Sequence, residues 1–148
     1  MKQITIIRHG DSSFIDNNDH DWSRPLSQKG INECIELAKY LSLNKMLPEK
    51  IICSDAIRTV ETSNIILEKT GWNPKLLDLD NNLYQANLEF LCELIAKQSD
   101  SIEKIILVGH NPGLEEFISW ILLGSIVSIP LKMTTGSFVQ MNLNVSLW

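Results

Sequence analysis

Short β-branched runs alternate with amphipathic segments along the whole length of this 148-residue chain. Runs rich in Ile and Val are typical of buried strands, and apolar residues spaced three and four apart are typical of helices. A chain that alternates strand and helix buries both most simply as a central sheet covered by helices. The pattern therefore predicts an α/β fold, a three-layer α/β/α sandwich with a mostly parallel central sheet.

The predicted elements follow from this periodicity and from residues that start or stop helices. Ser27 is expected to cap the first helix, and Gly71 to end the second. Residues 10–24 are polar and predict a loop. The strands are expected at residues 2–7, 51–53, 76–79, 104–108 and 137–143, and the helices at about 28–43, 56–70, 88–96 and 113–123.

Length and composition indicate one domain over residues 1–148. A chain of about 150 residues is usually a single domain. The apolar fraction of 44% and the charged fraction of 21% are those of a soluble globular protein. No Pro-, Gly- or Ser-rich linker, internal repeat or low-complexity segment divides the sequence.

Charge, hydropathy and cysteine content exclude several classes of protein. The net charge of −5 argues against nucleic acid as a partner. No apolar run reaches the roughly 18 residues of a membrane span, and the first apolar stretch is too short for a signal peptide. Cys34, Cys53 and Cys92 are odd in number and form no CxxC pair, which argues against disulfides and structural zinc. We expect three core thiols in a reducing cytoplasm.

Basic side chains gather where the predicted strands end. In an open α/β sheet, ligands bind beyond the carboxyl ends of the strands. The ends of three strands should therefore place Arg or His side chains at one edge of the sheet. The segments are Arg8-His9-Gly10, then Ser54 with Arg58 one helical turn later, then Gly109-His110-Asn111.

The types of these residues indicate phosphate chemistry. The chain has only three arginines but ten lysines, and Arg is preferred where a planar, permanently charged fork must hold phosphate. A neutral imidazole at His9 can attack phosphorus, and a second at His110 can donate to the phosphate. The alternative, ordinary salt bridges and structural histidines, explains this convergence less well. A metal site with His20 as a third ligand is disfavoured, because the spacing fits no metal motif and the arginines repel cations.

These residues resemble the signature of the histidine phosphatase (phosphoglycerate-mutase-like) superfamily, in its small branch typified by the SixA phosphohistidine phosphatase. The resemblance implies that His9 becomes a covalent phosphohistidine while Arg8, Arg58 and His110 hold the phosphate oxygens, without metal or cofactor. Gly10, Arg24, Ser54 and Asn111 lie in the matched segments and are further candidates for contacts with phosphate or substrate. The segments are Arg8-His9-Gly10, residues 24–30 (RPLSQKG), residues 54–59 (SDAIRT) with Thr62, and residues 108–114 (VGHNPGL).

One departure from the family concerns the general acid. Many members carry a Glu after the third strand, and that position falls near Asn82 here. Asp11 and Asp80 are the candidates for a substitute acid; alternatively, no strong acid is needed. Imidazole titrates near neutrality and leaves readily, unlike the alkoxide of a sugar phosphate. The missing Glu therefore favours cleavage of a P–N bond.

The leading hypothesis is a protein phosphohistidine phosphatase that acts on a partner such as a phosphotransfer domain and releases phosphate. The small size supports it, because no insertion is long enough to form a lid over a metabolite. A small-molecule phosphomonoesterase of the same superfamily is the main alternative. A non-catalytic phospho-ligand binding module and a mutase are the others. We also expect Phe117 and Trp120 in the core, and Trp148 either packed back or at an interface.

Overall fold

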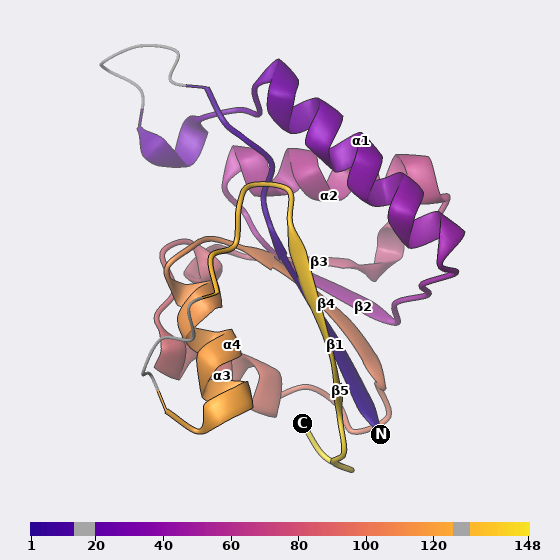
Figure 1. Ribbon diagram of the computed structural model, residues 1–148, viewed down its shortest axis with the longest axis vertical. Helices are drawn as coiled ribbons and strands as arrows, with labels where there is room; N and C mark the ends of the chain where they lie inside the picture. Colours follow the sequence, from indigo (N-terminus) through magenta and orange to yellow (C-terminus); the bar gives the residue numbers. More distant parts are fainter. Residues whose placement is uncertain (14–19, 126–130) are drawn as a thin grey trace.

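The computed structural model describes residues 1–13, 20–125 and 131–148. A five-stranded sheet forms the middle layer. Helices α1 (Gln28–Leu43) and α2 (Ile57–Thr70) cover one face of the sheet, and α3 (Leu88–Ala96) and α4 (Gly113–Leu123) cover the other (Figure 1). The predicted three-layer α/β/α sandwich is confirmed.

The sheet has the strand order β3-β2-β4-β1-β5. Strands β1, β4, β2 and β3 run parallel to one another, whereas β5 pairs antiparallel with β1 at the sheet edge. This is the mostly parallel sheet that the sequence predicts. The strands are β1 (Lys2–Arg8), β2 (Lys50–Ser54), β3 (Leu77–Asp80), β4 (Lys104–Gly109) and β5 (Phe138–Leu143).

The helix boundaries lie close to their predicted positions. The Ser27 hydroxyl accepts the Gly30 backbone N–H at 3.0 Å, as expected of an N-cap. The sequence pattern did not predict three short 3-10 turns, because one turn is too short to show a hydrophobic period. They are η1 (Asp21–Ser23), η2 (Pro74–Leu76) and η3 (Asn81–Leu83).

Two hydrophobic clusters fill the spaces on either side of the sheet. On β4, Ile105 and Leu107 belong to the cluster beneath α3 and α4, while Ile106 and Val108 belong to the cluster beneath α1 and α2. Side chains alternate across a strand, so a strand covered on both faces needs an unbroken apolar run. The central strands are thus packed against helices on both faces, and this packing determines where their carboxyl ends lie.

Two of the core predictions need correction. Cys34 and Cys53 are buried free thiols, but Cys92 is only half-buried. Phe117 is 3% exposed and packs in the core, whereas Trp120 is 44% exposed. Helix α4 lies at the surface, so only one side of it faces the sheet. None of the described helices has both the length and the apolar character needed to cross a membrane.

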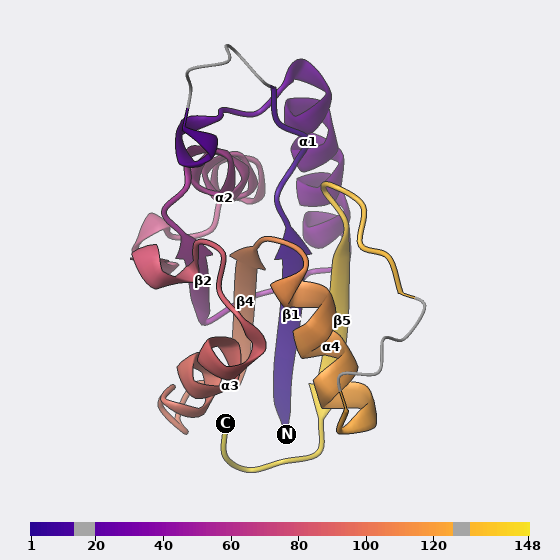
Figure 2. The ribbon, with the colours of Figure 1, turned by 90° about the vertical axis from the view of Figure 1, so that its left-hand side faces the viewer.

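The amino end of β1 is fastened to the end of the chain. Lys2 is 2% exposed, and its ammonium group donates to the carbonyls of Asp100 (2.6 Å) and Ile102 (2.8 Å). The same ammonium lies 5.4 Å from the ring centroid of Trp148, whose indole N–H donates to the Ile102 carbonyl at 2.7 Å. Trp148 therefore packs back onto its own fold, and Figure 2 shows the two termini near one another at this end of the sheet.

Candidate functional site

The parallel strands β1, β2 and β4 are neighbours, so their carboxyl ends meet at one edge of the sheet. His9 follows β1, Ser54 ends β2 and His110 follows β4. The rings of His9 and His110 lie with centroids 5.1 Å apart. The structure thus brings together the histidines that the sequence placed at separate strand ends.

A polar cavity of about 340 Å³ opens at this edge. Its wall contains Arg8, His9, Asp11, Ser12, Asp21, Arg24, Arg58, Gln85, His110, Asn111 and Thr135. Four of these residues were predicted from the sequence to be catalytic: Arg8, His9, Arg58 and His110. No cluster of three or more His, Cys, Asp or Glu suited to a metal occurs in the part of the chain that the structure describes.

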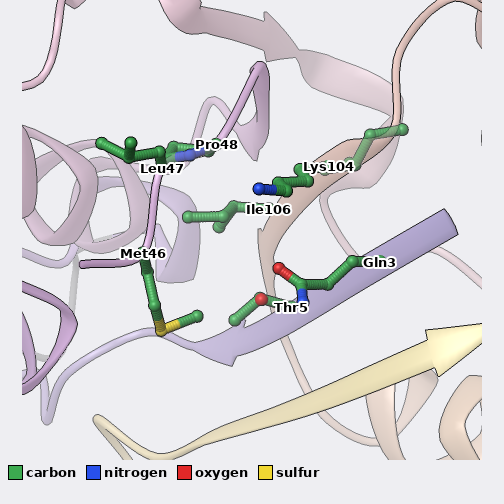
Figure 3. Close-up of a pocket in the computed structure, with 8 residues that line it drawn as sticks. Gln3, Thr5, Met46, Leu47, Pro48, Lys104 and Ile106 are labelled. Atoms are coloured by element: carbon green, nitrogen blue, oxygen red, sulfur yellow. The ribbon is translucent and has the colours of Figure 1, made fainter. Parts of the chain in front are cut away.

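A second hollow lies where the residue 46–48 segment approaches β1 and β4. It holds only about 10 Å³, room for about one water molecule. Figure 3 shows Met46, Leu47, Pro48 and Ile106 around it, with Lys104 as its only charged side chain. It has no converging group of charges, unlike the polar cavity at the carboxyl ends of the strands.

His9 presents an unprotonated nitrogen to this cavity. Its Nδ1 lies 2.7 Å from the Gly10 carbonyl, which only accepts, so the ring proton is assigned to Nδ1. Its Nε2 then accepts from Arg58 Nε at 3.3 Å. Burial, aided by the nearby charges of Arg58 and Arg8, lowers the pKa of His9 to about 4. The ring is therefore neutral at pH 7, with an unprotonated Nε2.

Gly10 lets the turn after β1 pass close to helix α1. A Cβ at this position would lie 2.7 Å from the Gly30 carbonyl oxygen and 2.9 Å from the Cys34 sulfur. The Gly10 N–H donates to the Thr62 hydroxyl on α2 at 3.1 Å. Gly10 thus anchors the turn that carries His9 between two helices.

Arg58 lies at the centre of the site and is 5% exposed. It stands in the first turn of α2, and its Nη2 is 3.3 Å from Nδ1 of His110. The other ring nitrogen of His110, Nε2, lies 2.9 Å from the Ser54 hydroxyl. Burial first, and then the Arg58 charge, lower the pKa of His110 to about 3. Both cavity histidines are therefore neutral rings beside a permanent cation.

Ser54 and Asn111 are placed to position other residues. Ser54 is fully buried behind His110 and does not line the cavity. Asn111 lines the cavity, but its amide nitrogen donates to the Glu115 carboxylate (2.7 Å) and the Met133 carbonyl (3.1 Å). Arg8 donates to the same Met133 carbonyl at 2.6 Å. The segment at Met133 thus fixes Arg8 and Asn111 together.

Arg24 reaches the cavity wall from the loop, and it brings Asp21 with it. Arg24 Nη1 pairs with Asp21 Oδ1 at 2.7 Å, and its Nη2 donates to the Ser12 hydroxyl at 2.7 Å. Arg58 Nη2 pairs with Asp21 Oδ2 at 3.0 Å, and the Tyr84 hydroxyl donates to the same oxygen at 2.7 Å. Together, the Tyr84 hydrogen bond and the two arginines hold the pKa of Asp21 well below its usual range.

The sequence analysis did not identify Asp21 and Tyr84 as site residues. Asp21 stands in a polar loop and Tyr84 in the turn after η3, and neither follows a strand directly. Only the folded chain places them against Arg58. No local pattern in the sequence indicates this contact.

The two candidate acids are placed differently. Asp11 lines the cavity, and its carboxylate accepts the Ser27 hydroxyl at 2.6 Å. Asp80 does not line the cavity, and its carboxylate accepts the backbone and side-chain N–H groups of Asn82 at 2.9 and 3.0 Å. Asp11 is therefore the better placed of the two to meet a leaving group.

Comparison with known proteins gives one family. Residues 4–87, more than half of the chain, match the Histidine phosphatase superfamily (branch 1). A curated relative is an uncharacterized chloroplastic protein of Arabidopsis thaliana, 31% identical over 147 aligned residues. The alignment covers 94% of this chain and 66% of that protein, so the chain spans about two thirds of its relative's length.

Solved structures give the same fold. The protein histidine phosphatase SixA in complex with tungstate superposes with a TM-score of 0.81 at 21% identity, covering 95% of this chain and 88% of that one. A mycobacterial glucosyl-3-phosphoglycerate phosphatase superposes with a TM-score of 0.63 at 17% identity, covering 96% and 90%. Identities this low establish a shared fold, and the two proteins differ in the substrate that their names give.

Proposed function

The chain belongs to the histidine phosphatase superfamily, and we propose that it hydrolyses phosphohistidine on a protein through a covalent phosphohistidine on His9. The observation that carries the proposal is the state of His9. Its Nε2 is unprotonated, its pKa is about 4, and Arg58 lies beside it. A neutral imidazole next to fixed cations is suited to accept a phosphoryl group.

In the first step, His9 Nε2 attacks phosphorus and the P–N bond of the substrate breaks. The electron pair of that bond leaves on the substrate imidazole, which takes up a proton from the Asp11 carboxyl group or from water. Arg8 and Arg58 face the cavity and stabilise the phosphoryl oxygens as charge builds on them. This step depends on position and charge, which agrees with a cavity walled mainly by charged and polar side chains.

In the second step, water attacks the phosphorus held on His9. The His9–phosphorus bond breaks, phosphate is released, and the imidazole regains its neutral form. Ser54 lies 2.9 Å from His110 Nε2, and its hydroxyl can donate to that nitrogen. The ring proton is then on Nδ1, beside Arg58, and the ring lines the cavity as an N–H donor. We assign to His110, oriented in this way, the stabilisation of the transferring group. No metal or organic cofactor enters either step of the proposal.

A phosphohistidine substrate is consistent with the weak set of acids in the site. The family's Glu position falls near Asn82, whose side chain is bound to Asp80. An imidazole leaving group needs less protonation than an alkoxide, because it titrates near neutrality. Asp11, on the cavity wall, is the carboxyl group we assign to protonate it if one is required.

We propose a histidine-containing phosphotransfer domain, or a similar carrier, as the partner, and a reducing cytoplasm as the compartment. The site lies in the turns after three strands, and a side chain presented by another protein can enter it from the sheet edge. A small phosphate monoester is the second candidate. A polar cavity of about 340 Å³ has room for a small metabolite.

The test compares wild type with His9→Ala on a histidine-phosphorylated phosphotransfer domain. We expect rapid loss of the phosphoryl label and a trapped phosphoenzyme with wild type, and neither with the variant. His20→Ala is the matched control, because His20 is exposed and outside the cavity wall. Turnover of p-nitrophenyl phosphate or 3-phosphoglycerate without label loss would favour the metabolite phosphatase. Full activity in His9→Ala would refute the nucleophile.

A further inference from the structure

Two acidic side chains, Asp11 and Asp21, line a cavity whose three arginines suit it to bind an anion. The Asp21 carboxylate is joined to Arg58 Nη2 at 3.0 Å, while Arg58 Nε is 3.3 Å from the nucleophilic nitrogen of His9. Only the guanidinium group of Arg58 therefore separates Asp21 from a phosphoryl group bound at His9. The carboxylate must affect which substrates the cavity accepts.

Asp21 retains capacity for a further hydrogen-bond donor. An ionised carboxylate offers about four acceptor positions. Among the described residues, three donors are seen: Arg24 on Oδ1, and Arg58 and Tyr84 on Oδ2. The side chain is 45% exposed and lines the cavity. A substrate N–H can therefore reach it, whereas a substrate carboxylate is repelled.

We propose that Asp21 sets the charge preference of the cavity. It disfavours substrates with a second negative charge near the phosphoryl group, and it favours leaving groups that carry an N–H donor or a positive charge. This inference rests on the proposed phosphatase function of the site and concerns its substrate class. Phosphohistidine fits this preference, because its imidazole becomes an N–H donor when protonated. A phosphate ester that also carries a carboxylate does not fit it.

Asp21 could instead serve only to hold Arg58 in position. Arg58 Nη1 also donates to the Asp21 backbone carbonyl at 2.6 Å, a contact that a side-chain substitution keeps. An anchoring role predicts an equal loss of activity on every phosphate substrate. A charge role predicts a change in the ratio between substrates that differ in charge alone.

The experiment measures this ratio with two esters of nearly the same shape. Glycerol 3-phosphate carries a hydroxymethyl group where 3-phosphoglycerate carries a carboxylate. We expect Asp21→Asn to raise kcat/KM for 3-phosphoglycerate relative to glycerol 3-phosphate about fivefold over the wild-type ratio, as removal of one partly exposed charge allows. Where turnover of an ester is too slow, its inhibition constant against p-nitrophenyl phosphate gives the same ratio.

Three further measurements separate the outcomes. Asp21→Glu keeps the charge and should keep the preference, and Asp78→Asn removes a charge on β3 outside the cavity wall and should not alter it. Added salt should reduce the difference in this ratio between wild type and Asp21→Asn. An unchanged ratio in Asp21→Asn, or an equal fall on both esters, would overturn the proposal. A shifted ratio without phosphohistidine hydrolysis would refute the proposed substrate and leave the role of Asp21 standing.

Discussion

At the scale of single residues, His9 and His110 make stability depend on pH. Their pKa values in the folded protein are about 4 and about 3, below the 6.5 of an exposed histidine. The unfolded chain therefore binds more protons between about pH 6.5 and pH 4, so the free energy of unfolding falls as the pH falls through that window. A full shift is worth ~1.4 kcal/mol per pH unit for each histidine.

Urea denaturation at pH 7, 6, 5 and 4.5 measures this effect. We expect a progressive loss of stability in wild type and a shallower loss in His9→Gln and in His110→Gln. His20→Gln, at an exposed position, should follow wild type. Asp21 does not interfere with this measurement. Its lowered pKa changes the free energy of unfolding only near and below the pH at which an aspartate usually titrates. A flat pH profile in wild type would contradict the neutral buried rings.

The sequence identified the residues of the site that follow a strand directly. His9 and His110 could be found because the carboxyl ends of parallel strands must meet. Asp21 and Tyr84 could not, because their contact with Arg58 joins three segments that no periodicity relates. The long-range partners of a site arise from packing, which a single sequence does not display.

At the scale of elements, the contact between α1 and the turn after β1 determines where the site residues stand. Gly30 packs against the backbone of Asp11, and a Cβ on Gly30 would overlap the Asp11 carbonyl oxygen. We expect Gly30→Ala to lower the free energy of unfolding by about 2 kcal/mol, in the range of overpacked sites, and to lower kcat by displacing Asp11. Guanidinium denaturation and steady-state kinetics measure both, with the exposed neighbour Lys29→Ala as control. Wild-type stability in Gly30→Ala would contradict this packing.

The strands and helices themselves were predictable because each has a clear period and clear end signals. The first helix begins after Ser27 as its cap predicts, and β4 appears where the 104–108 run was expected. The antiparallel direction of β5 and the exposure of Trp120 were not predicted. Both depend on where an element lies in the assembled layers, and a local pattern does not contain that information.

At the scale of the whole molecule, the tie between Lys2 and Trp148 lies at the end of the sheet opposite the cavity. We expect Trp148→Ala to cost about 2 kcal/mol of stability, because it removes a half-buried ring, a hydrogen bond and a cation–π contact. Activity per folded molecule should not change. Trp120→Ala is the matched control and should cost less, since that ring is 44% exposed. Thermal melts of the three proteins, with active-site titration, test the prediction; equal melting temperatures would contradict it.

The position of β1 in the sheet has a consequence for synthesis on the ribosome. Among the described strands β1 comes first along the chain, yet its two neighbours, β4 and β5, begin only at Lys104 and Phe138. Throughout most of translation the apolar residues Ile4, Ile6 and Ile7 therefore have no partner strand, and they are exposed to aggregation or to chaperones. The histidine that follows β1 is therefore synthesised well before the two strands that flank β1, and the sheet around it can close only after Phe138–Leu143 has been made.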